Sequence, residues 1–332
     1  MKKILFLLCM MLLFITGCGN YSENDVVKDL EKKINKIKGY KLDGELEITN
    51  NDEVYNYDIE VSYKSDHYYK VSLTNTANNH TQVILKNDDG VYILTPSLNK
   101  SFKFQSDWPY SNSQIYLLEA LVDDISDDKD RTFEATNNGY VFNTKVDYPN
   151  NKNLVSQKIE LSKKLKFKRV KVYDSNKVIC MDMKFTDIDY SPTFKKNYFE
   201  LDTIMKTYSE TTEETLETTK LDDSIYPMLL PNGTKLASEE KVQKDDGERI
   251  IMTFDGDKPF LLVEETASVE EQHTIIPTNG EPYRLMDTLG VMTDNSLSWS
   301  SNGIEYYMVS DVLNTDELVE IAQSINVLPT MK

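Results

Sequence analysis

Cysteine and histidine are scarce in this chain of 332 residues, which contains three of each. Cys9 and Cys18 lie close to its start, so Cys180 stands alone in the body of the chain and a disulfide-stapled scaffold is excluded. Cys180 lies in a strand-like run, where we expect a buried, unreactive thiol. The three histidines show no metal-ligand spacing, and we predict neither a metal site nor a cofactor.

Sequence motifs for catalysis are absent as well. The chain has no His-Glu-x-x-His pair, no Gly-x-Ser-x-Gly elbow, no phosphate-binding loop and no dinucleotide-binding glycine pattern. The acidic cluster at residues 123–130 lacks the spacing of a calcium loop, and we interpret it as a solvated helix end. We therefore predict a protein that is not an enzyme and assign no catalytic residue. A hydrolase with scattered active-site residues stays open as a third reading.

No apolar run in the sequence reaches the roughly 20 residues that a membrane-spanning helix needs. The run at residues 4–15 follows Lys2 and Lys3 and ends just before Cys18. This arrangement is typical of an export signal, and the order Ile-Thr-Gly-Cys resembles a bacterial lipobox. We expect residues 1–17 to be removed and Cys18 to carry an acyl chain such as palmitate. The alternative is an ordinary signal peptide in which Cys18 is incidental.

Positive charge is in short supply. The chain has 37 Lys and Arg against 55 Asp and Glu, a net charge of −18, and loss of residues 1–17 with Lys2 and Lys3 leaves −20. Binding to phosphate backbones needs clustered cations, so nucleic acid is excluded as a partner, and broad adhesion to anionic head groups is disfavoured. We expect the protein to be held at the extracytoplasmic face of the cell membrane by the lipid anchor on Cys18.

We divide the mature chain into four segments. Residues 18–24 are the lipidated tether, residues 25–205 form a first domain, residues 206–224 are an acidic linker rich in Thr and Glu, and residues 225–332 form a small C-terminal α+β domain. A short exposed helix is the alternative for the linker.

Two helices of the first domain are marked by capping boxes. The box at Ser22 and Asp25 predicts a helix that ends at Gly39, and its apolar face favours packing on a sheet over contact with the membrane. A second box that starts at Ser111 predicts a helix over residues 111–125.

Alternating apolar and polar residues predict strands around these helices. Residues 40–48 and 55–63 place apolar side chains on one face and polar ones on the other, as in an antiparallel sheet with one wet face. The Asn-Asp-Asp-Gly turn at residues 87–90 predicts a hairpin. About five strands before the second helix and about four after it favour one curved antiparallel sheet with the helices on its concave side. The predicted fold class is α+β, an incomplete β-barrel closed by helices.

The C-terminal domain shows the same kinds of signal over a shorter length. Turns at residues 255–259 and 301–303 predict two hairpins, and Asn314 with Glu317 predicts the start of a final helix.

The inner face of the first sheet is the candidate binding site. Its side chains either line an apolar hollow or simply fill the core, and periodicity alone does not distinguish the two. The candidate lipid-binding residues are Tyr40, Leu42, Tyr55, Tyr57, Ile59, Val61, Val71, Tyr140, Phe142, Met181, Met183 and Phe185, and the candidate lid residues of the second helix are Ile115, Leu118, Leu121 and Val122.

The chain resembles the LolA/RseB superfamily, and more narrowly its Gram-positive lipoprotein members linked to sporulation and germination. The lipobox at Cys18, the strand at residues 40–48 and the segment from Trp108 to Leu121 carry the resemblance, which covers residues 22–205. Residues 225–332 are similar to a small C-terminal domain that accompanies such lipoproteins.

This resemblance implies a LolA-like half-barrel whose hydrophobic interior holds acyl chains, or a sensor that binds a regulatory partner. Soluble carriers of the superfamily use an arginine in an early strand to hold the lid, whereas the first arginine here is Arg131. We therefore expect a tethered, non-enzymatic lipoprotein that binds a lipid, an acyl chain or a lipidated protein. The alternative is an envelope interaction protein with a filled core that regulates a partner, such as a spore-wall hydrolase or a signalling protein.

Overall fold

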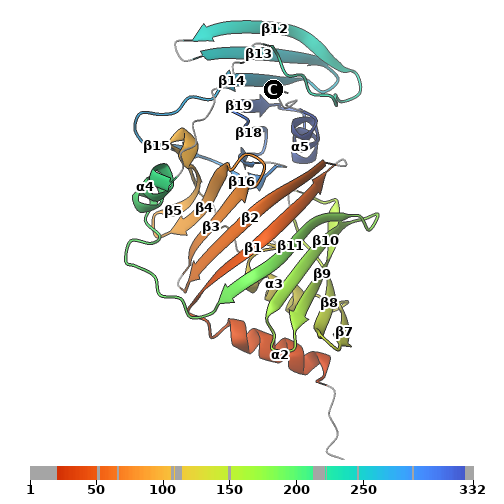
Figure 1. Ribbon diagram of the computed structural model, residues 1–332. Coiled ribbons are helices and arrows are strands. Elements are labelled where there is room, and N and C mark those ends of the chain that lie inside the picture. The colour runs from red at the N-terminus through yellow and green to blue at the C-terminus, as the bar shows by residue number, and fades with distance from the viewer. Residues whose placement is uncertain are drawn as a thin grey trace, which may run out of the picture.

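The computed structural model describes residues 21–50, 53–65, 67–105, 108, 114–148, 151–211, 221, 223–244, 247–285 and 288–325. The predicted signal peptide, Cys18, Ser111 and most of the predicted linker lie outside these residues. Within them the protein is mostly β-structure with a few helices, arranged as two sheets (Figure 1). None of the described helices is long and apolar enough to cross a bilayer.

The first sheet has twelve strands and is open, ending at β15 and β7. All of its neighbouring strands are antiparallel except the pair β15 and β6, which is parallel. In spatial order the strands are β15 (Thr274–Thr278), β6 (Lys100–Phe104), β5 (Gly90–Thr95), β4 (Thr81–Asn87), β3 (Tyr68–Asn75), β2 (Glu53–Lys64), β1 (Gly39–Asn50), β11 (Ile179–Asp189), β10 (Phe167–Asp174), β9 (Leu154–Ser162), β8 (Gly139–Lys145) and β7 (Thr132–Thr136).

Two helices, α2 (Glu23–Ile34) and α3 (Leu118–Asp127), bury their apolar faces in one core against this sheet. The capping box at Ser22 and Asp25 is confirmed, but the predicted end of the helix at Gly39 is wrong, because α2 ends at Ile34. Gly39 opens β1 instead, where a Cβ atom would lie only 2.7 Å from the backbone oxygen of Tyr63 on β2. The glycine therefore serves close strand pairing and not the end of the helix.

The second helix begins later than the sequence predicts. Its N-cap is Leu117, which makes no side-chain cap, and the Tyr40 hydroxyl accepts a hydrogen bond from the backbone N–H of Leu118 at 3.3 Å. One free donor of the first turn is thus satisfied from the sheet. Six strands of the first sheet precede α3, five (β7 to β11) follow it directly, and β15 joins the sheet from the later part of the chain, against about five and about four predicted.

The opposite face of β3, β4 and β5 is covered by α4 (Leu201–Thr211). Ile204 and Met205 of this helix, with Phe199 just before it, pack on Val83, Leu85, Tyr92 and Leu94 in a second, smaller core. The helix continues to residue 211, so the first residues of the predicted linker are helical. The short 3₁₀-helix η1 (Pro96–Leu98) joins β5 to β6.

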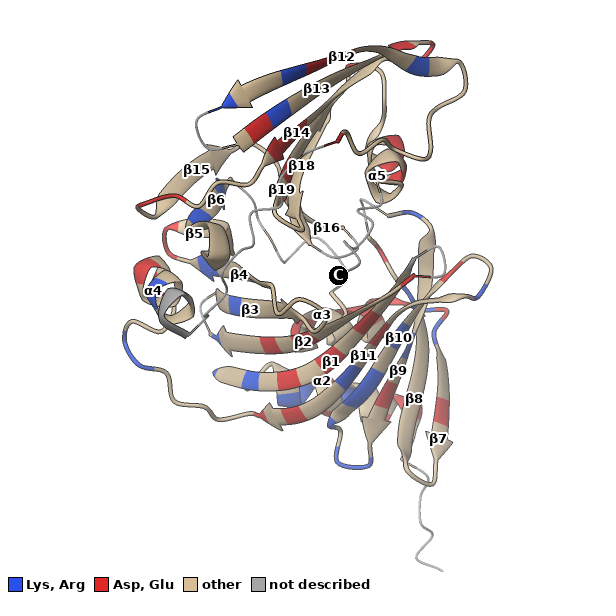
Figure 2. Ribbon diagram, turned by 45° about the horizontal axis from the view of Figure 1, so that its top comes forward, with Lys and Arg blue, Asp and Glu red and all other residues tan. Residues whose placement is uncertain are grey.

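The outer face of β1, β11 and β10 is charged, with acidic and basic residues interspersed (Figure 2). Asp182 of β11 contacts both Arg169 and Lys171 of β10, and Lys184 lies 3.1 Å from Glu45 of β1. This wet face is the counterpart of the apolar face that packs against α2 and α3, as the alternation predicts.

The second sheet has seven strands and is covered by α5 (Thr315–Gln323). The predicted hairpins at residues 255–259 and 301–303 and the capping box at Asn314 and Glu317 are confirmed. In spatial order the strands are β12 (Thr234–Lys244), β13 (Gly247–Gly256), β14 (Phe260–Thr266), β19 (Ile304–Val309), β18 (Ser296–Ser301), β17 (Leu289–Met292) and β16 (Glu281–Arg284).

The two sheets are joined by the pairing of β15 with β6 and by a partly buried ion pair. The strand β15 lies between β14 and β16 in sequence but pairs with β6 of the first sheet, with Ile276 opposite Phe102. Lys100 of β6 is buried, and its Nζ lies 2.9 Å from both carboxylate oxygens of Glu305 on β19. Leu289 and Val291 of β17 belong to the first core. The C-terminal unit is therefore docked firmly on the first sheet.

Candidate functional site

The candidate lipid-binding residues come together on one face of the first sheet, as predicted. Tyr55 and Phe185 are half-buried, and the other ten are buried in the core that also takes in α2 and α3. The four candidate lid residues, Ile115, Leu118, Leu121 and Val122, are buried in the same core. The helices thus fill most of this face with side chains, and the lipid-binding role assigned to these residues stays a prediction.

One carboxyl group of α3 lies in this core. Glu119 Oε2 accepts a hydrogen bond from the Tyr40 hydroxyl at 2.9 Å, whereas Oε1 is buried without a hydrogen-bond partner among the described residues. Burial raises the pKa of Glu119 to about 7, although the bond from Tyr40 acts in the opposite direction. The Glu119 carboxyl therefore changes its protonation state near neutral pH. It does so where α3 contacts the first sheet.

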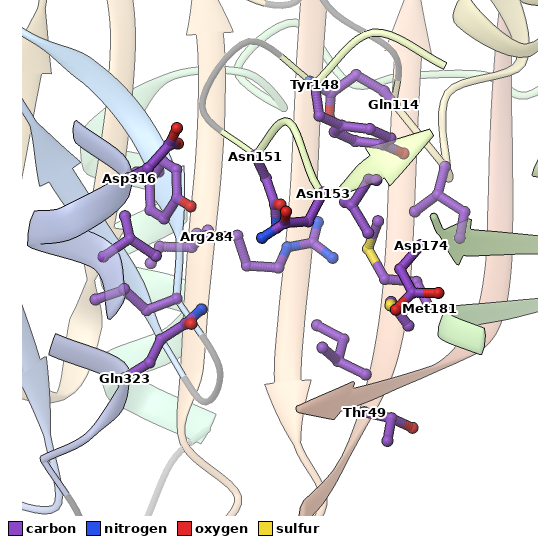
Figure 3. A pocket seen from close by; sticks show the side chains of 18 of the residues that line it. Thr49, Gln114, Tyr148, Asn151, Asn153, Asp174, Met181, Arg284, Asp316 and Gln323 are labelled. Carbon is purple, nitrogen blue, oxygen red and sulfur yellow. The ribbon is translucent and has the colours of Figure 1, made fainter. Parts of the chain in front are cut away.

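A cleft of about 640 Å³ opens at one end of the first sheet, where the C-terminal unit meets it (Figure 3). It is in the size range of small-molecule sites. Of the residues predicted to bind lipid or to form the lid, Met181 and Ile115 line this cleft. Other walls come from the loops after β8 and β10, from β16 and from α5.

The walls of the cleft are partly apolar and partly polar. The apolar lining residues are Ile48, Ile84, Trp108, Ile115, Leu154, Val178, Met181, Leu285, Leu289 and Val319, and the polar ones include Thr49, Gln114, Asn151, Asn153, Asp174, Arg284, Asp316, Glu320 and Gln323. Such a mixed lining suits a ligand with an apolar part and a polar part.

Arg284 supplies the cation of the cleft. Its guanidinium carbon lies 5.0 Å from the centre of the Tyr116 ring, a cation–π distance. The Nε and Nη1 atoms of Arg284 are buried and have no hydrogen-bond partner among the described residues. A buried donor left without a partner costs about 1–3 kcal/mol, and more in a charged group, so this arrangement favours a bound anion.

Tyr148 lines the same cleft and also has an unused hydroxyl. Its oxygen is buried without a hydrogen-bond partner among the described residues. Burial raises the pKa of Tyr148 well above its ordinary value; Asp124 adds to the shift and Arg284 opposes it. The hydroxyl therefore keeps its proton and is available as a donor.

The position of Arg284 is fixed from the first sheet. Leu285 donates its N–H to the oxygen of Thr288 at 2.9 Å, closing the turn between β16 and β17. Gln82 of β4 is buried and holds the far side of this turn: its Oε1 accepts from Leu289 N–H at 2.5 Å and from the Thr288 hydroxyl at 3.0 Å. Its amide also donates to the Leu289 oxygen at 3.1 Å.

Cys180 also lines the cleft. It is half-buried and not fully buried as expected, and burial raises the pKa of its thiol, which lowers its reactivity. Sequence reasoning missed Arg284, Tyr116 and Tyr148 as site residues. The rarity of arginine was the one sequence feature that could have drawn attention to Arg284, because the chain contains only four arginines.

Comparison with known proteins identifies the family. No family model matches the chain. The sporulation protein YdcC of Bacillus subtilis (strain 168) is 37% identical over 317 residues, which cover 94% of this chain and 93% of YdcC. The chain belongs to the YdcC family of sporulation proteins. The link to sporulation that the sequence resemblance implies is thereby confirmed.

Solved structures also resemble this YdcC relative. One chain of the complex of the CwlD amidase from Clostridioides difficile with the GerS lipoprotein matches with a TM-score of 0.31 and 18% identity over 51% of this chain and 96% of that chain. The LolA superfamily protein NE2245 of Nitrosomonas europaea matches with a TM-score of 0.29 and 10% identity over 53% of this chain and 98% of that chain.

Proposed function

We propose that this YdcC relative is a non-enzymatic lipoprotein, tethered through Cys18 to the outer side of the cell membrane, that binds the acyl chain of a lipid or of a lipidated protein. The observation that carries the proposal is the cleft of about 640 Å³, whose apolar wall is continuous with the core of the first sheet. The finer description of this sheet as a LolA-like half-barrel, closed by α2 and α3, belongs to the same proposal.

Two features favour the cleft over the concave face as the place of binding. The concave face is occupied by side chains of α2 and α3, so a ligand there has to displace a packed helix. The cleft is open already and needs no such movement. Each methylene group that leaves water adds about 0.8 kcal/mol, so a chain of about eight buried methylenes supplies roughly 6 kcal/mol before the costs of binding.

The test is uptake of a fluorescent fatty acid by the chain without its predicted signal and lipidated cysteine, residues 19–332. We expect saturable uptake, and a loss of affinity of about tenfold in Leu154→Gln, because Leu154 is a buried residue of the apolar wall. Leu236→Gln, on the exposed strand β12, is the matched control and should bind as the parent does. No uptake, together with no lipid in organic extracts of the purified protein, contradicts the proposal.

One observation favours an envelope interaction protein as the second candidate. The strand β12 forms the edge of the second sheet, is 11 residues long, and is exposed over nearly its whole length. An open edge of this kind accepts a strand from a partner protein. A partner whose binding is lost when a proline replaces an edge residue of β12, while fatty acid uptake is unchanged, would support this function in place of lipid binding.

A further inference from the structure

The cleft contains a specific site for charge in addition to its apolar wall. We propose that Arg284 binds a single anionic group, a carboxylate or a phosphate monoester, at the head of an alkyl chain, so that the ligand is a singly headed anionic amphiphile. This inference rests on the proposed function and narrows the class of its ligand.

The guanidinium of Arg284 is placed for this task and lacks a partner that would compete with it. Its guanidinium carbon lies 5.0 Å from the centre of the Tyr116 ring, and the buried Nε and Nη1 atoms have no hydrogen-bond partner among the described residues. The N–H groups of Nε and Nη1 point to different sides of the planar guanidinium, so each can donate a charge-assisted hydrogen bond to an oxygen of a carboxylate or phosphate on its own side. The hydroxyl of Tyr148, also buried and unpartnered, supplies a further donor on the same cleft.

The acidic residues around the cleft limit how much negative charge it can accept. Asp174, Asp316 and Glu320 line it, yet no ion pair joins Arg284 to an acidic side chain in the described part of the chain. Asp174 accepts backbone N–H groups of its own hairpin, at 2.9 Å from Asn176 and 2.7 Å from Val178. Asp316 and Glu320 are exposed on α5. These carboxylates repel a ligand with several negative charges, and so does the net charge of −18 on the whole chain. One small anionic group is still accommodated beside Arg284.

The alkyl part of the ligand would lie along the apolar wall. Leu154, Met181 and Leu289 come from three different strands of the first sheet and its docked unit, and all line the cleft with Arg284. Figure 3 shows Met181 and Arg284 among the lining side chains. An amphiphile contacts both parts of this site, its anionic head the charged donor and its alkyl chain the apolar wall. A small free anion contacts only the donor, and an uncharged alkane contacts only the wall.

The experiment compares decanoate, decyl phosphate and decanol, which share one alkyl length, by calorimetry at about pH 8, where the carboxylate is ionised. We expect the protein to bind one or both anions at least about tenfold more tightly than decanol, a difference of about 1.4 kcal/mol. Arg284→Gln should bind decanol as before and lose the preference for the anions. Arg284→Lys should retain part of it, because the charge remains but the planar fork is lost. Arg249→Gln, on β13 outside the cleft, is the matched control.

The outcomes separate this inference from the proposed function. If the parent binds decanol and the anions equally, or if Arg284→Gln keeps the preference, the inference is overturned and lipid binding stands. If none of the three ligands binds, the proposed function fails as well. Acetate or inorganic phosphate binding as tightly as the alkyl anions overturns the amphiphile in favour of a free anion. The ligand comparison on the parent chain decides the matter even if Arg284→Gln does not fold.

Discussion

At the scale of single residues, the molecule keeps several polar groups in its cores that sequence patterns do not reveal. Glu119 and Glu264 are buried carboxyls, one in each unit, and burial raises the pKa of each to about 7. Glu264 accepts the backbone N–H of Ile225 at 2.9 Å and so fixes the entry of the chain into the second sheet. Because the folded state holds these protons more tightly than the unfolded chain, it should lose stability as the pH rises from about 4.5 to about 7.

Replacing Glu119 by glutamine tests this linkage. Glutamine can still accept a hydrogen bond from Tyr40 but carries no titrating proton, so Glu119→Gln should be more stable than the parent at about pH 8, by on the order of 1–3 kcal/mol, and similar to it at about pH 5. Denaturant midpoints at both pH values measure the change. Glu134→Gln, exposed on β7, is the control and should leave the pH dependence unaltered. Equal loss of stability in Glu119→Gln at both pH values would show that the proton plays no part.

At the scale of elements, β1 and β11 pair with a shift in register between Asp43 and Gly44. A Cβ atom at Gly44 would approach the backbone oxygen of Lys184 and the Met183 side chain more closely than van der Waals contact allows. The glycine thus permits the close pairing of β1 and β11 in the interior of the first sheet.

Gly44→Ala should therefore separate β1 from β11 locally and lower the free energy of unfolding by about 1–3 kcal/mol. Chemical denaturation monitored by tyrosine and tryptophan fluorescence measures the loss. Glu45→Ala removes an exposed side chain at the next position and serves as the control, with a change below about 0.5 kcal/mol. Equal midpoints for the two variants would mean that the strands have room for the extra carbon.

Elements with local signals were predictable from sequence, and elements defined by distant partners were not. The capping boxes at Ser22 and Asn314 and the turn at residues 87–90 act within a few residues, so their patterns identify them correctly. The strand β15 has five residues and pairs with a strand about 170 positions earlier, which no local pattern records. The cleft is lined by residues from Ile48 to Gln323, so alternation predicts which side chains are buried but not where a hollow remains.

At the scale of the whole molecule, the proposed attachment to the membrane rests on one residue, Cys18. We expect Cys18→Ser to move the protein from the membrane fraction to the medium, because lipid is the predicted anchor and the chain carries a net charge of −18 that does not adhere to anionic head groups. Cell fractionation with labelled palmitate measures both location and acylation. Cys180→Ser should remain in the membrane fraction and is the matched control. A Cys18→Ser protein that stays with the membrane, or a parent that incorporates no label, contradicts the anchor.

The strand β15 also determines when the first sheet can be completed during synthesis. During synthesis from the N-terminus, β6 is complete at residue 104. The backbone donors and acceptors on its outer side stay unpaired until β15 is complete at residue 278. Until then the incomplete sheet has an exposed edge strand, and exposed edge strands pair with strands of other chains. A molecule truncated before residue 274 should therefore be prone to aggregate with its own copies, even though the other eleven strands of its first sheet are intact.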